Sequence, residues 1–456
     1  MRRTRRGAFI LYPAIAGLVG AALALSGTAA QDGAQARLLT AAYNASGQQL
    51  FKQFSAAAGN IVFSPYSIGT AMAMAIAGAR GETERQMIEA LKHGLARSEI
   101  DAANAGVLST LNAYDKSSTA PACPEGMRLS AQRCEAAPAA NGQCVFPARR
   151  EGELCVATPR YPPSAKLAVA NALMLTKHGG LVSKDYAALL KDKYSAEVFE
   201  NADLEQINGW VARKTERKID KIIEQLDPNS AAVLINAIYF KAAWASTFRQ
   251  QDTREDAFQL SSSAAVQVPT MHKRAYYSMV ARAGYRAIRL PYAVRELGMI
   301  FVLPDAVDGL ADVAARLGTQ DLSELFAALR AGQAKYVDLS LPRFKTAFKA
   351  ELVTPFRQAG MTLPFDPNRA DFSGMTGRPA SEERLVISQI VHRAVIEVQE
   401  EGTEAAAATA IEMSRTSAPP SPEPFRVDRP FLFYVVDDAT GAILFQGRVA
   451  DPRGTS

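Results

Sequence analysis

Histidine, cysteine and tryptophan are scarce in this chain of 456 residues, which contains four, four and two of them. The sequence also has no G-x-S-x-G nucleophile motif, no H-E-x-x-H zinc motif and no G-x-x-x-x-G-K-S/T phosphate loop. Because histidine is the side chain used most often for general base catalysis and for binding catalytic metals, its scarcity argues against a hydrolase or a metalloenzyme. We therefore expect a protein that is not an enzyme and has no catalytic residue, metal or cofactor.

A strong charge of one sign is also missing. The formal net charge is +5, but four of the positive charges are arginines among the first six residues, and without them the charge is close to +1, since 5 − 4 = 1. This balance excludes the broad basic surface that nucleic-acid-binding proteins present. We expect no nucleic-acid partner.

The first thirty residues have the three parts of a secretory signal. A basic start precedes an apolar stretch from Phe9 to Leu25, and Thr28–Ala30 supplies the small residues of a cleavage site. A membrane anchor is the alternative, but the stretch is short and contains Pro13. We predict a signal peptide over residues 1–30 and a mature protein that is secreted, extracellular or periplasmic and does not bind a membrane.

All four cysteines lie within residues 115–164, a stretch rich in Pro, Gly and Ala. An even number of cysteines in an exported protein favours two disulfides, and of the three possible pairings we prefer the local one. The preferred pairs are Cys123–Cys134 and Cys144–Cys155. A zinc site is disfavoured because no C-x-x-C pair occurs. The composition is typical of a loop, and three roles stay open: a docking module, a stabilising cap or a tolerated decoration.

The segment over residues 397–417 combines two conflicting patterns. It is rich in Ala and Glu, which are good helix formers, and taken alone it fits an exposed helix or a flexible loop. In an extended backbone, however, Glu404 and Glu412 would point outward and an alternating set would point inward: Thr403, Ala405, Ala407, Thr409, Ile411 and Met413. Between Thr403 and Thr409 no residue except Glu404 is larger than Thr, as a strand that enters a packed sheet requires. We predict a segment that changes conformation, with Gly402 as its pivot.

The sequence EEGTEAAAAT, which begins at Glu400, resembles the proximal hinge of the reactive-centre loop in serpins. Five further segments resemble serpin segments and occur in the order of that family. They are NIVFSPYSIGTAMAMAIAGARGET (60–83), INGWVARKTERKI (207–219), LINAIYFKAAW (234–244), SQIVHRAVIEV (388–398) and DRPFLFYVVDDATGAILFQGRVADP (428–452). On this ordered set the chain is identified as a member of the serpin family, in which residues 115–164 are an insertion.

The resemblance implies an α+β serpin fold, with about eight to nine helices packed on three β-sheets and an exposed reactive-centre loop. It implies one domain over residues 31–456 and a reactive-centre loop over residues 400–424. The hinge of that loop would run from its first residue through the small side chains that follow. The hinge residues are Glu400, Glu401, Gly402, Thr403, Glu404, Ala405, Ala406, Ala407 and Ala408.

The resemblance also assigns residues to the two regions of the central sheet, the shutter and the breach, that rearrange when the sheet opens. They are Ser64, Ser67, Asn236, Trp244, Arg343 and His392. A charge pair between Glu400 and Arg343 would restrain premature opening. Such a pair, if exposed, contributes only about 0–1 kcal/mol.

The function that the resemblance implies is suicide-substrate inhibition of serine or cysteine endopeptidases, with the acyl-enzyme trapped when the cleaved loop inserts into the central sheet. The partner would be an elastase-, subtilisin- or trypsin-like serine endopeptidase, and the inhibitor a monomer. Counting from Glu400, as in relatives, places the scissile bond at Thr416–Ser417, and a shift of one residue places it at Arg415–Thr416. The alternative is a non-inhibitory serpin that acts as a binding or structural protein.

Overall fold

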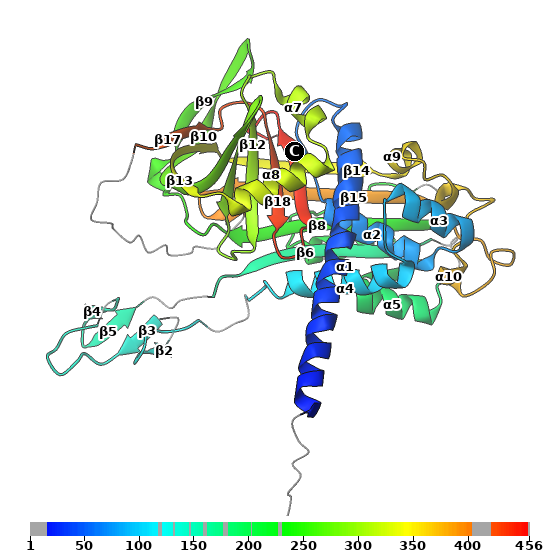
Figure 1. The fold of residues 1–456 in the computed structure, drawn as a ribbon, viewed down its shortest axis with the longest axis horizontal. Helices are drawn as coiled ribbons and strands as arrows, with labels where there is room; N and C mark the ends of the chain where they lie inside the picture. The colour runs from blue at the N-terminus through cyan, green and yellow to red at the C-terminus, as the bar shows by residue number, and fades with distance from the viewer. Residues whose placement is uncertain are drawn as a thin grey trace, which may run out of the picture.

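The protein is built from two large β-sheets, a small separate sheet and a set of helices (Figure 1). The computed structural model describes residues 16–116, 121–130, 133–145, 147–157, 162–176, 181–201, 203–226, 230–403 and 421–454, with side chains from Gln31 onward. Within these residues there are ten α-helices and three sheets, which confirms the predicted fold class. The helix number slightly exceeds the expected eight to nine because α9 (Val353–Gln358) and α10 (Ser373–Thr376) are very short.

The six-stranded sheet has the order β14-β15-β16-β8-β6-β7. Its strands are β6 (Ala165–Leu175), β7 (Glu197–Glu200), β8 (Ala232–Ala243), β14 (Phe344–Glu351), β15 (Ile387–Gln399) and β16 (Gly402–Thr403). The two central long strands, β8 and β15, pair in parallel with each other, while β6 and β14 pair antiparallel on either side. The first nine residues of β8 are all buried, and its nearly continuous apolar sequence is typical of a strand covered on both faces.

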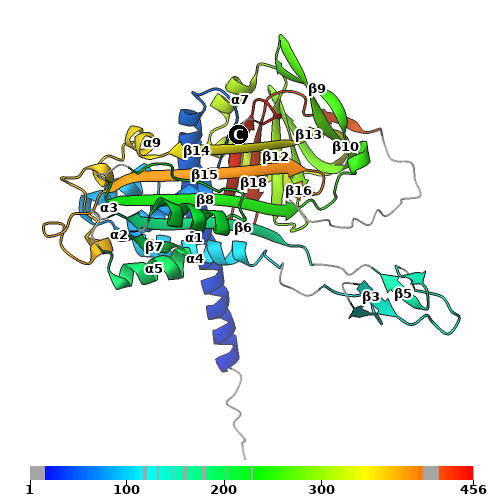
Figure 2. The same ribbon diagram turned by 180° about the vertical axis from the view of Figure 1, so that it is seen from behind.

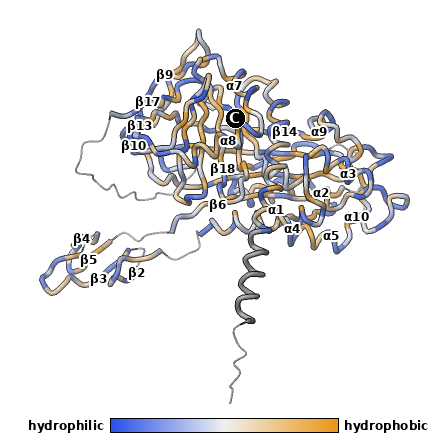
Figure 3. The backbone as a smooth tube through the Cα atoms, viewed as in Figure 1, coloured by the Kyte–Doolittle hydropathy of each residue, from blue (hydrophilic) through white to orange (hydrophobic). Residues whose placement is uncertain are grey.

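The nine-stranded sheet follows the order β1-β19-β18-β12-β11-β10-β13-β17, with β9 paired to β10. Its strands are β1 (Ile61–Phe63), β9 (Arg254–Ser261), β10 (Ala264–Arg282), β11 (Tyr285–Pro291), β12 (Leu297–Pro304), β13 (Ala334–Pro342), β17 (Glu423–Arg426), β18 (Phe431–Asp437) and β19 (Ile443–Val449). Every residue of β12 and β18 is buried, and Figure 3 shows hydrophobic residues gathered around β18. The main hydrophobic core contains these strands and also includes residues of the six-stranded sheet, such as Leu234, Phe240 and Ile390.

The remaining helices flank the two large sheets (Figures 1 and 2), and those over residues 310–316 and 319–331 contact strands of the nine-stranded sheet. They are α2 (Pro65–Gly78), α3 (Gly81–Ala90), α4 (Arg97–Asn112), α5 (Lys184–Tyr194), α6 (Leu204–Lys214), α7 (Leu310–Arg316) and α8 (Thr319–Ala331). All residues of α2 are buried. This helix begins where it does because the Ser64 side chain accepts a hydrogen bond from the Ser67 amide, and Pro65 suits the first helical position.

Helix α1 (Ala16–Phe54) continues through the predicted cleavage site after Ala30. Its first turns extend away from the rest of the protein (Figure 1). Among the residues that the structure describes, no helix combines the length and the hydrophobicity needed to cross a membrane. The signal peptide over residues 1–30 stays a prediction.

The insertion contains a small sheet with the order β2-β3-β5-β4. Its strands are β2 (Arg128–Ser130), β3 (Arg133–Ala136), β4 (Arg149–Glu151) and β5 (Leu154–Ala157). The expectation of a loop is therefore wrong for this part of the chain. Strands of three or four residues carry too little alternation to be recognised in the sequence, and here disulfides hold the hairpins together. The disulfides are Cys123–Cys134 and Cys144–Cys155, which confirms the preferred pairing.

A row of polar side chains crosses the centre of the six-stranded sheet. His392 on β15, Asn236 on β8 and Asn171 on β6 are register partners. The Nδ1 atom of His392 lies 2.5 Å from the Oδ1 atom of Asn236, and the Nδ2 group of Asn236 donates to the Oδ1 atom of Asn171 at 2.5 Å. All three residues are at most 2% exposed, so each depends on the others for its hydrogen bonds.

The polar row is also tied to the start of α2. The backbone amide of Ser64 donates to Nε2 of His392 at 3.3 Å, and Asn236 donates to the carbonyl of Ser67 at 2.9 Å. Because Nε2 accepts a hydrogen bond, the ring is neutral and donates through Nδ1 to Asn236. Burial lowers the pKa of His392 from 6.5 to about 3, which agrees with a neutral ring.

The buried histidine predicts that the protein loses stability in mild acid. Because the folded pKa of His392 lies below the unfolded value of 6.5, the unfolded chain binds this proton first and stability falls as the pH drops below 6.5. The loss from this group is about 2 kcal/mol between pH 6.5 and 5. Chemical unfolding at pH 7 and pH 5 measures it. The His392→Gln variant should lose less stability over this interval than the parent, and an equal loss in both would contradict the assignment.

Candidate functional site

The candidate site is the end of the six-stranded sheet where the chain leaves β15 and turns back as β16. Gly402 and Thr403 of β16 lie between β8 and β15 and pair antiparallel with both. The register partner of Thr403 on β8 is Ala242, and on β15 it is Val398. From the sequence we expected the loop to enter the sheet only after cleavage. In the structure Gly402 and Thr403 already lie in the sheet of the intact chain.

Gly402 is required by the close approach of two backbones. Its φ is +152°, and a Cβ atom at this position would lie 2.2 Å from the carbonyl oxygen of Ala242. No side chain fits in that space, and L residues avoid this conformation. The pivot predicted for Gly402 therefore has a steric basis that comes from the neighbouring strand.

Thr403 is fully buried next to two stacked aromatic rings. Its hydroxyl group lies 2.7 Å from the hydroxyl group of Tyr292, with which it shares a hydrogen bond. The Tyr292 ring stacks on Trp244 at a centroid distance of 4.6 Å and an angle of 10° between the ring planes. The Trp244 indole N–H donates to the carbonyl of Gln399 at 3.0 Å, and its backbone N–H donates to the carbonyl of Glu401 at 3.0 Å. Trp244 thus holds the turn between β15 and β16.

Glu400 anchors the same turn through its carboxylate. The Arg343 Nε group donates to both carboxylate oxygens, at 2.8 and 2.9 Å, and Thr253 donates a short hydrogen bond to one of them. The Glu400 backbone carbonyl accepts from the Phe248 amide at 2.9 Å. Burial raises the pKa of Glu400, but the hydrogen bonds from Arg343 and Thr253 lower it more, so the pKa lies below its ordinary value. The carboxylate is therefore ionised at neutral pH.

The pair of Glu400 and Arg343 is not an exposed surface pair. The Glu400 side chain is 2% exposed, although the Arg343 side chain is 43% exposed. Loss of Arg343 would leave a buried carboxylate without its cation, which costs more than the loss of a surface pair. The figure for an exposed pair therefore does not apply to Glu400.

The sheet below β16 is closed. Residues from Ile387 to Val395 of β15 pair in parallel with residues from Ala232 to Tyr239 of β8. Further entry of the segment that follows Thr403 would require these strands to separate. The polar row of His392 lies in that closed region, about 20 Å from Ala242 at the rise of a β-strand.

The predicted site residues therefore form two groups in the described part of the chain. Glu400, Glu401, Gly402 and Thr403 lie with Trp244 and Arg343 at the open end of the sheet, whereas Ser64, Ser67, Asn236 and His392 form the polar row at its centre. The other predicted residues lie outside the described residues. They are Glu404, Ala405, Ala406, Ala407 and Ala408 of the hinge and Arg415, Thr416 and Ser417 of the two candidate bonds.

Three residues of these groups were missed by sequence reasoning. Tyr292 and Thr253 come from distant segments, and nothing in their local sequence indicates a contact with the hinge. Asn171 had a signal: NALML at 171–175 and NAIYF at 236–240 both place an Asn within an apolar strand. Such a polar residue must find a buried partner, and two of them on neighbouring strands can pair. Within the described residues, no three or more His, Cys, Asp or Glu side chains are grouped to hold a metal ion.

Comparison with known proteins gives a consistent result. A family model described as Serpin (serine protease inhibitor) matches residues 41–452. Iripin-2 from Ixodes ricinus is 32% identical over 422 residues, which cover 90% of this chain and 93% of that protein. Serpin B6 from Pongo abelii is 32% identical over 397 residues, which cover 86% and 93%.

Solved structures show the same architecture. The thermophilic serpin tengpin in its native state matches with a TM-score of 0.71 and 25% identity, over 90% of this chain and 94% of that one. Human thyroxine-binding globulin matches with a TM-score of 0.71 and 24% identity, over 92% and 99%, and this similarity shows the fold alone. Together, the family model, the two relatives and the shared fold show that the chain belongs to the serpin family.

Proposed function

We propose that the protein is a suicide-substrate inhibitor of serine endopeptidases. The observation that carries the proposal is the position of Gly402 and Thr403, which already lie between β8 and β15 while residues of small volume follow. A segment that starts in the gap and carries small side chains can extend the same strand with little steric resistance. The protein supplies a substrate loop and no catalytic residue.

The first step is ordinary attack of the protease on the exposed loop. The serine hydroxyl of the protease adds to the carbonyl carbon before the scissile bond, its proton passes through the histidine of the protease to the leaving amine, and the peptide C–N bond breaks. The upstream part of the loop is then joined to the protease through an ester. Its downstream part remains attached to β17.

Insertion of the cleaved segment supplies the driving force. β16 is antiparallel to both of its neighbours, whereas β8 and β15 are parallel to each other where they are in contact. Extension of β16 would replace one parallel pairing by two antiparallel ones, which are slightly more stable per residue. About ten new backbone hydrogen bonds would add roughly 0.5–1.5 kcal/mol each.

Insertion also explains why the ester would persist. About thirteen residues separate Thr403 from Thr416, and a strand rises about 3.3 Å per residue, so the protease would move roughly 43 Å along the sheet. Compression of the protease against the far end of the inhibitor would displace its oxyanion donors and its general base. Hydrolysis of the ester would then stall.

The scissile bond sets the class of target. Cleavage at Thr416–Ser417 suits elastase-like or subtilisin-like proteases, and cleavage at Arg415–Thr416 suits trypsin-like proteases, which have an acid in the primary pocket. We propose that the inhibitor meets these enzymes outside the cytoplasm, as a monomer, after removal of residues 1–30. The alternative, a non-inhibitory serpin that acts as a binding or structural protein, predicts cleavage without a stable complex.

A charge at the position of Thr403 tests the insertion mechanism. The Thr403→Arg variant would place an unpaired cation at the buried position beside Tyr292, which would destabilise β16 and oppose its extension along the sheet. We expect the variant to be cleaved as a substrate, with loss of the covalent complex on denaturing gels with trypsin, an elastase and subtilisin. Ser421→Arg is the matched control, because Ser421 is exposed at the far end of the loop, and it should keep the complex. Complex formation by Thr403→Arg equal to that of the parent would refute insertion.

A charge reversal at Glu400 tests the restraint on the hinge. The Glu400→Lys variant places a cation against Arg343 in the space of a buried carboxylate, and we expect a loss of about 2 kcal/mol or more of native stability, with polymers or an inactive latent form on heating. Native gels detect the polymers, and residual inhibition after heating measures how much active monomer remains.

The matched control for the hinge variant is Glu423→Lys. Glu423 forms an exposed ion pair with Lys335 at 3.1 Å, so this change should alter stability by less than about 1 kcal/mol. If the two variants gave the same yield of inhibitory monomer after heating, the buried pair would have no special role.

A further inference from the structure

The insertion lies at the same end of the protein as the candidate hinge. Ala165, the first residue of β6 after the insertion, and Thr403 of the hinge are both register partners of Ala242 on β8. Since neighbouring strands are 4.7–4.9 Å apart, these two residues are separated by about 10 Å. Figures 1 and 2 both show the small sheet on the side of the molecule to which β8 and β15 point.

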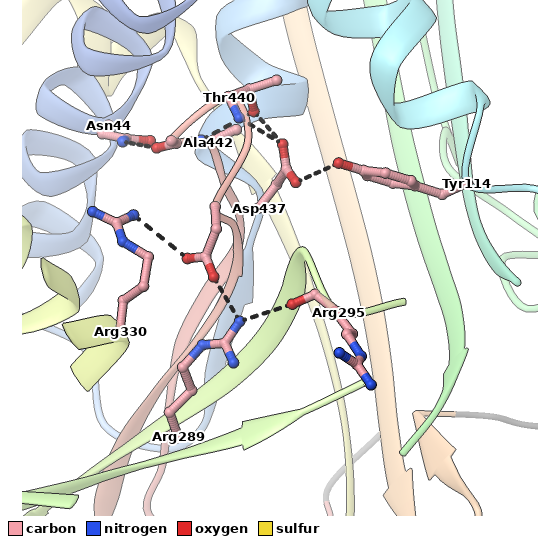
Figure 4. Close-up of polar contacts among 10 residues, drawn as sticks. Asn44, Tyr114, Arg289, Arg295, Arg330, Asp437, Thr440 and Ala442 are labelled. Atoms are coloured by element: carbon pink, nitrogen blue, oxygen red, sulfur yellow. Dashed lines mark hydrogen bonds and ion pairs between the residues drawn. The ribbon is translucent and has the colours of Figure 1, made fainter. Parts of the chain in front are cut away.

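The base of the insertion is fixed to this end of the sheet. The Ala165 amide donates to the carbonyl of Tyr114 at 2.9 Å, and the Lys116 amide donates to the Ser164 hydroxyl at 2.8 Å, so the two ends of the insertion are closed together. The Tyr114 hydroxyl donates to Asp437 at 2.8 Å (Figure 4). Burial, and then the Asp437 carboxylate, raise the pKa of Tyr114, so the phenol keeps the proton that it donates.

Asp437 is itself held within the hairpin between β18 and β19. It accepts hydrogen bonds from the amide and the hydroxyl group of Thr440. The neighbouring Asp438 accepts from Arg289 at 2.7 Å and lies 3.8 Å from Arg330 (Figure 4). The attachment point of the insertion is therefore braced by the nine-stranded sheet.

Residues 121–157, which we term the disulfide module, form a structure of their own. Hydrogen bonds and ion pairs within the described part of the module join its own residues, as between Arg150 and the Gly142 carbonyl and between Arg133 and Glu151. One face of its sheet carries the pairs of Arg133 with Glu135 and Glu151. Two disulfides and these pairs stiffen a sheet that is too small to have a hydrophobic core.

The module exposes large apolar side chains that the rest of the protein does not cover. Leu129, Val145 and Leu154 are 46%, 78% and 41% exposed. The module has four acidic and four arginine side chains, so its net charge is zero, since 4 − 4 = 0. A neutral surface with exposed apolar groups suits a protein partner and not a polyanion.

We propose that the disulfide module is a second docking site for the protease that attacks the reactive-centre loop. This inference rests on the proposed function. A protease of about 230 residues is about 45 Å across, far more than the 10 Å between the attachment of the module and the hinge. A protease bound to the loop therefore lies within reach of the module.

Two contact sites on one chain change the rate of capture. After the first contact, the second becomes intramolecular, and this raises the chance that an encounter leads to cleavage of the loop. The module takes no part in loop insertion, because its strands belong to a separate sheet. It should therefore raise the second-order rate of inhibition and leave the number of inhibitor molecules used per trapped protease unchanged.

Two variants test the module with the full-length protein as reference. In the first, residues 117–163 are replaced by a short Gly-Ser link, which the contact between Tyr114 and Ala165 allows. In the second, Leu129, Val145 and Leu154 are replaced by Ser. The control variant carries Glu125→Ser and Glu153→Ser, two exposed changes in the module that keep its apolar surface.

The measurement uses the fastest-inhibited enzyme among trypsin, pancreatic elastase and subtilisin. We expect inhibition to be about tenfold slower for both test variants, with unchanged stoichiometry and an intact denaturant-resistant complex, and parental rates for the control.

Rates within twofold of the parent for both test variants would overturn the docking site, as would an equal loss in the control. A dimer of the parent that the triple Ser variant abolishes would identify a second copy of the chain as the occupant and also overturn it. If the full-length protein formed no covalent complex at all, that result would contradict the proposed inhibitory function itself, and it is distinguishable from a change in the rate of inhibition.

Discussion

The contact between Gly402 and the backbone of β8 is the constraint on which the functional end of this protein depends. The carbonyl oxygen of Ala242 occupies the space of a side chain at this position, and the positive φ of Gly402 turns the chain back into the sheet. Because of this turn, Thr403 lies antiparallel to β15 and reaches Tyr292. The buried carboxylate of Glu400 holds the start of the same turn through Arg343 and Thr253. The hinge is therefore held in a defined starting position.

A second constraint acts in the closed part of the sheet. β8 and β15 are parallel neighbours, and a strand placed between them would be antiparallel to both, as β16 already is. In the proposed mechanism, the exchange of one parallel pairing for two antiparallel ones would favour insertion through added hydrogen bonds and antiparallel geometry. It is opposed by the row of His392, Asn236 and Asn171, whose buried hydrogen bonds must be broken before the strands separate. The intact chain thus combines a favourable final pairing with a polar barrier in the middle of the sheet.

The insertion is attached where it can act on the surroundings of the loop without entering the core. Its two ends meet at Tyr114 and Ala165, so the body of the fold is continuous beneath it. The disulfides replace the hydrophobic core that such a small sheet cannot form. Its strands share no sheet with the body, and this separation allows a binding role and an insertion role to coexist in one chain.

The sequence by itself determined much of this protein. The ordered segments indicated the family and the α+β fold, the small residues after Gly402 indicated a segment that can enter a sheet, and the even number of cysteines indicated two disulfides, for which we preferred the local pairing. These features depend on residue volume, periodicity and short separations along the chain, which the sequence contains directly.

Only the tertiary structure decided which distant residues meet. It brought Tyr292 to Thr403, Asn171 to Asn236 and the attachment of the insertion to the hinge, and it buried the Glu400 carboxylate, whose exposure the sequence left open. The physical reason is that strand register and burial arise from pairings between segments far apart in the chain. No local pattern of volume, charge or hydrophobicity specifies those pairings.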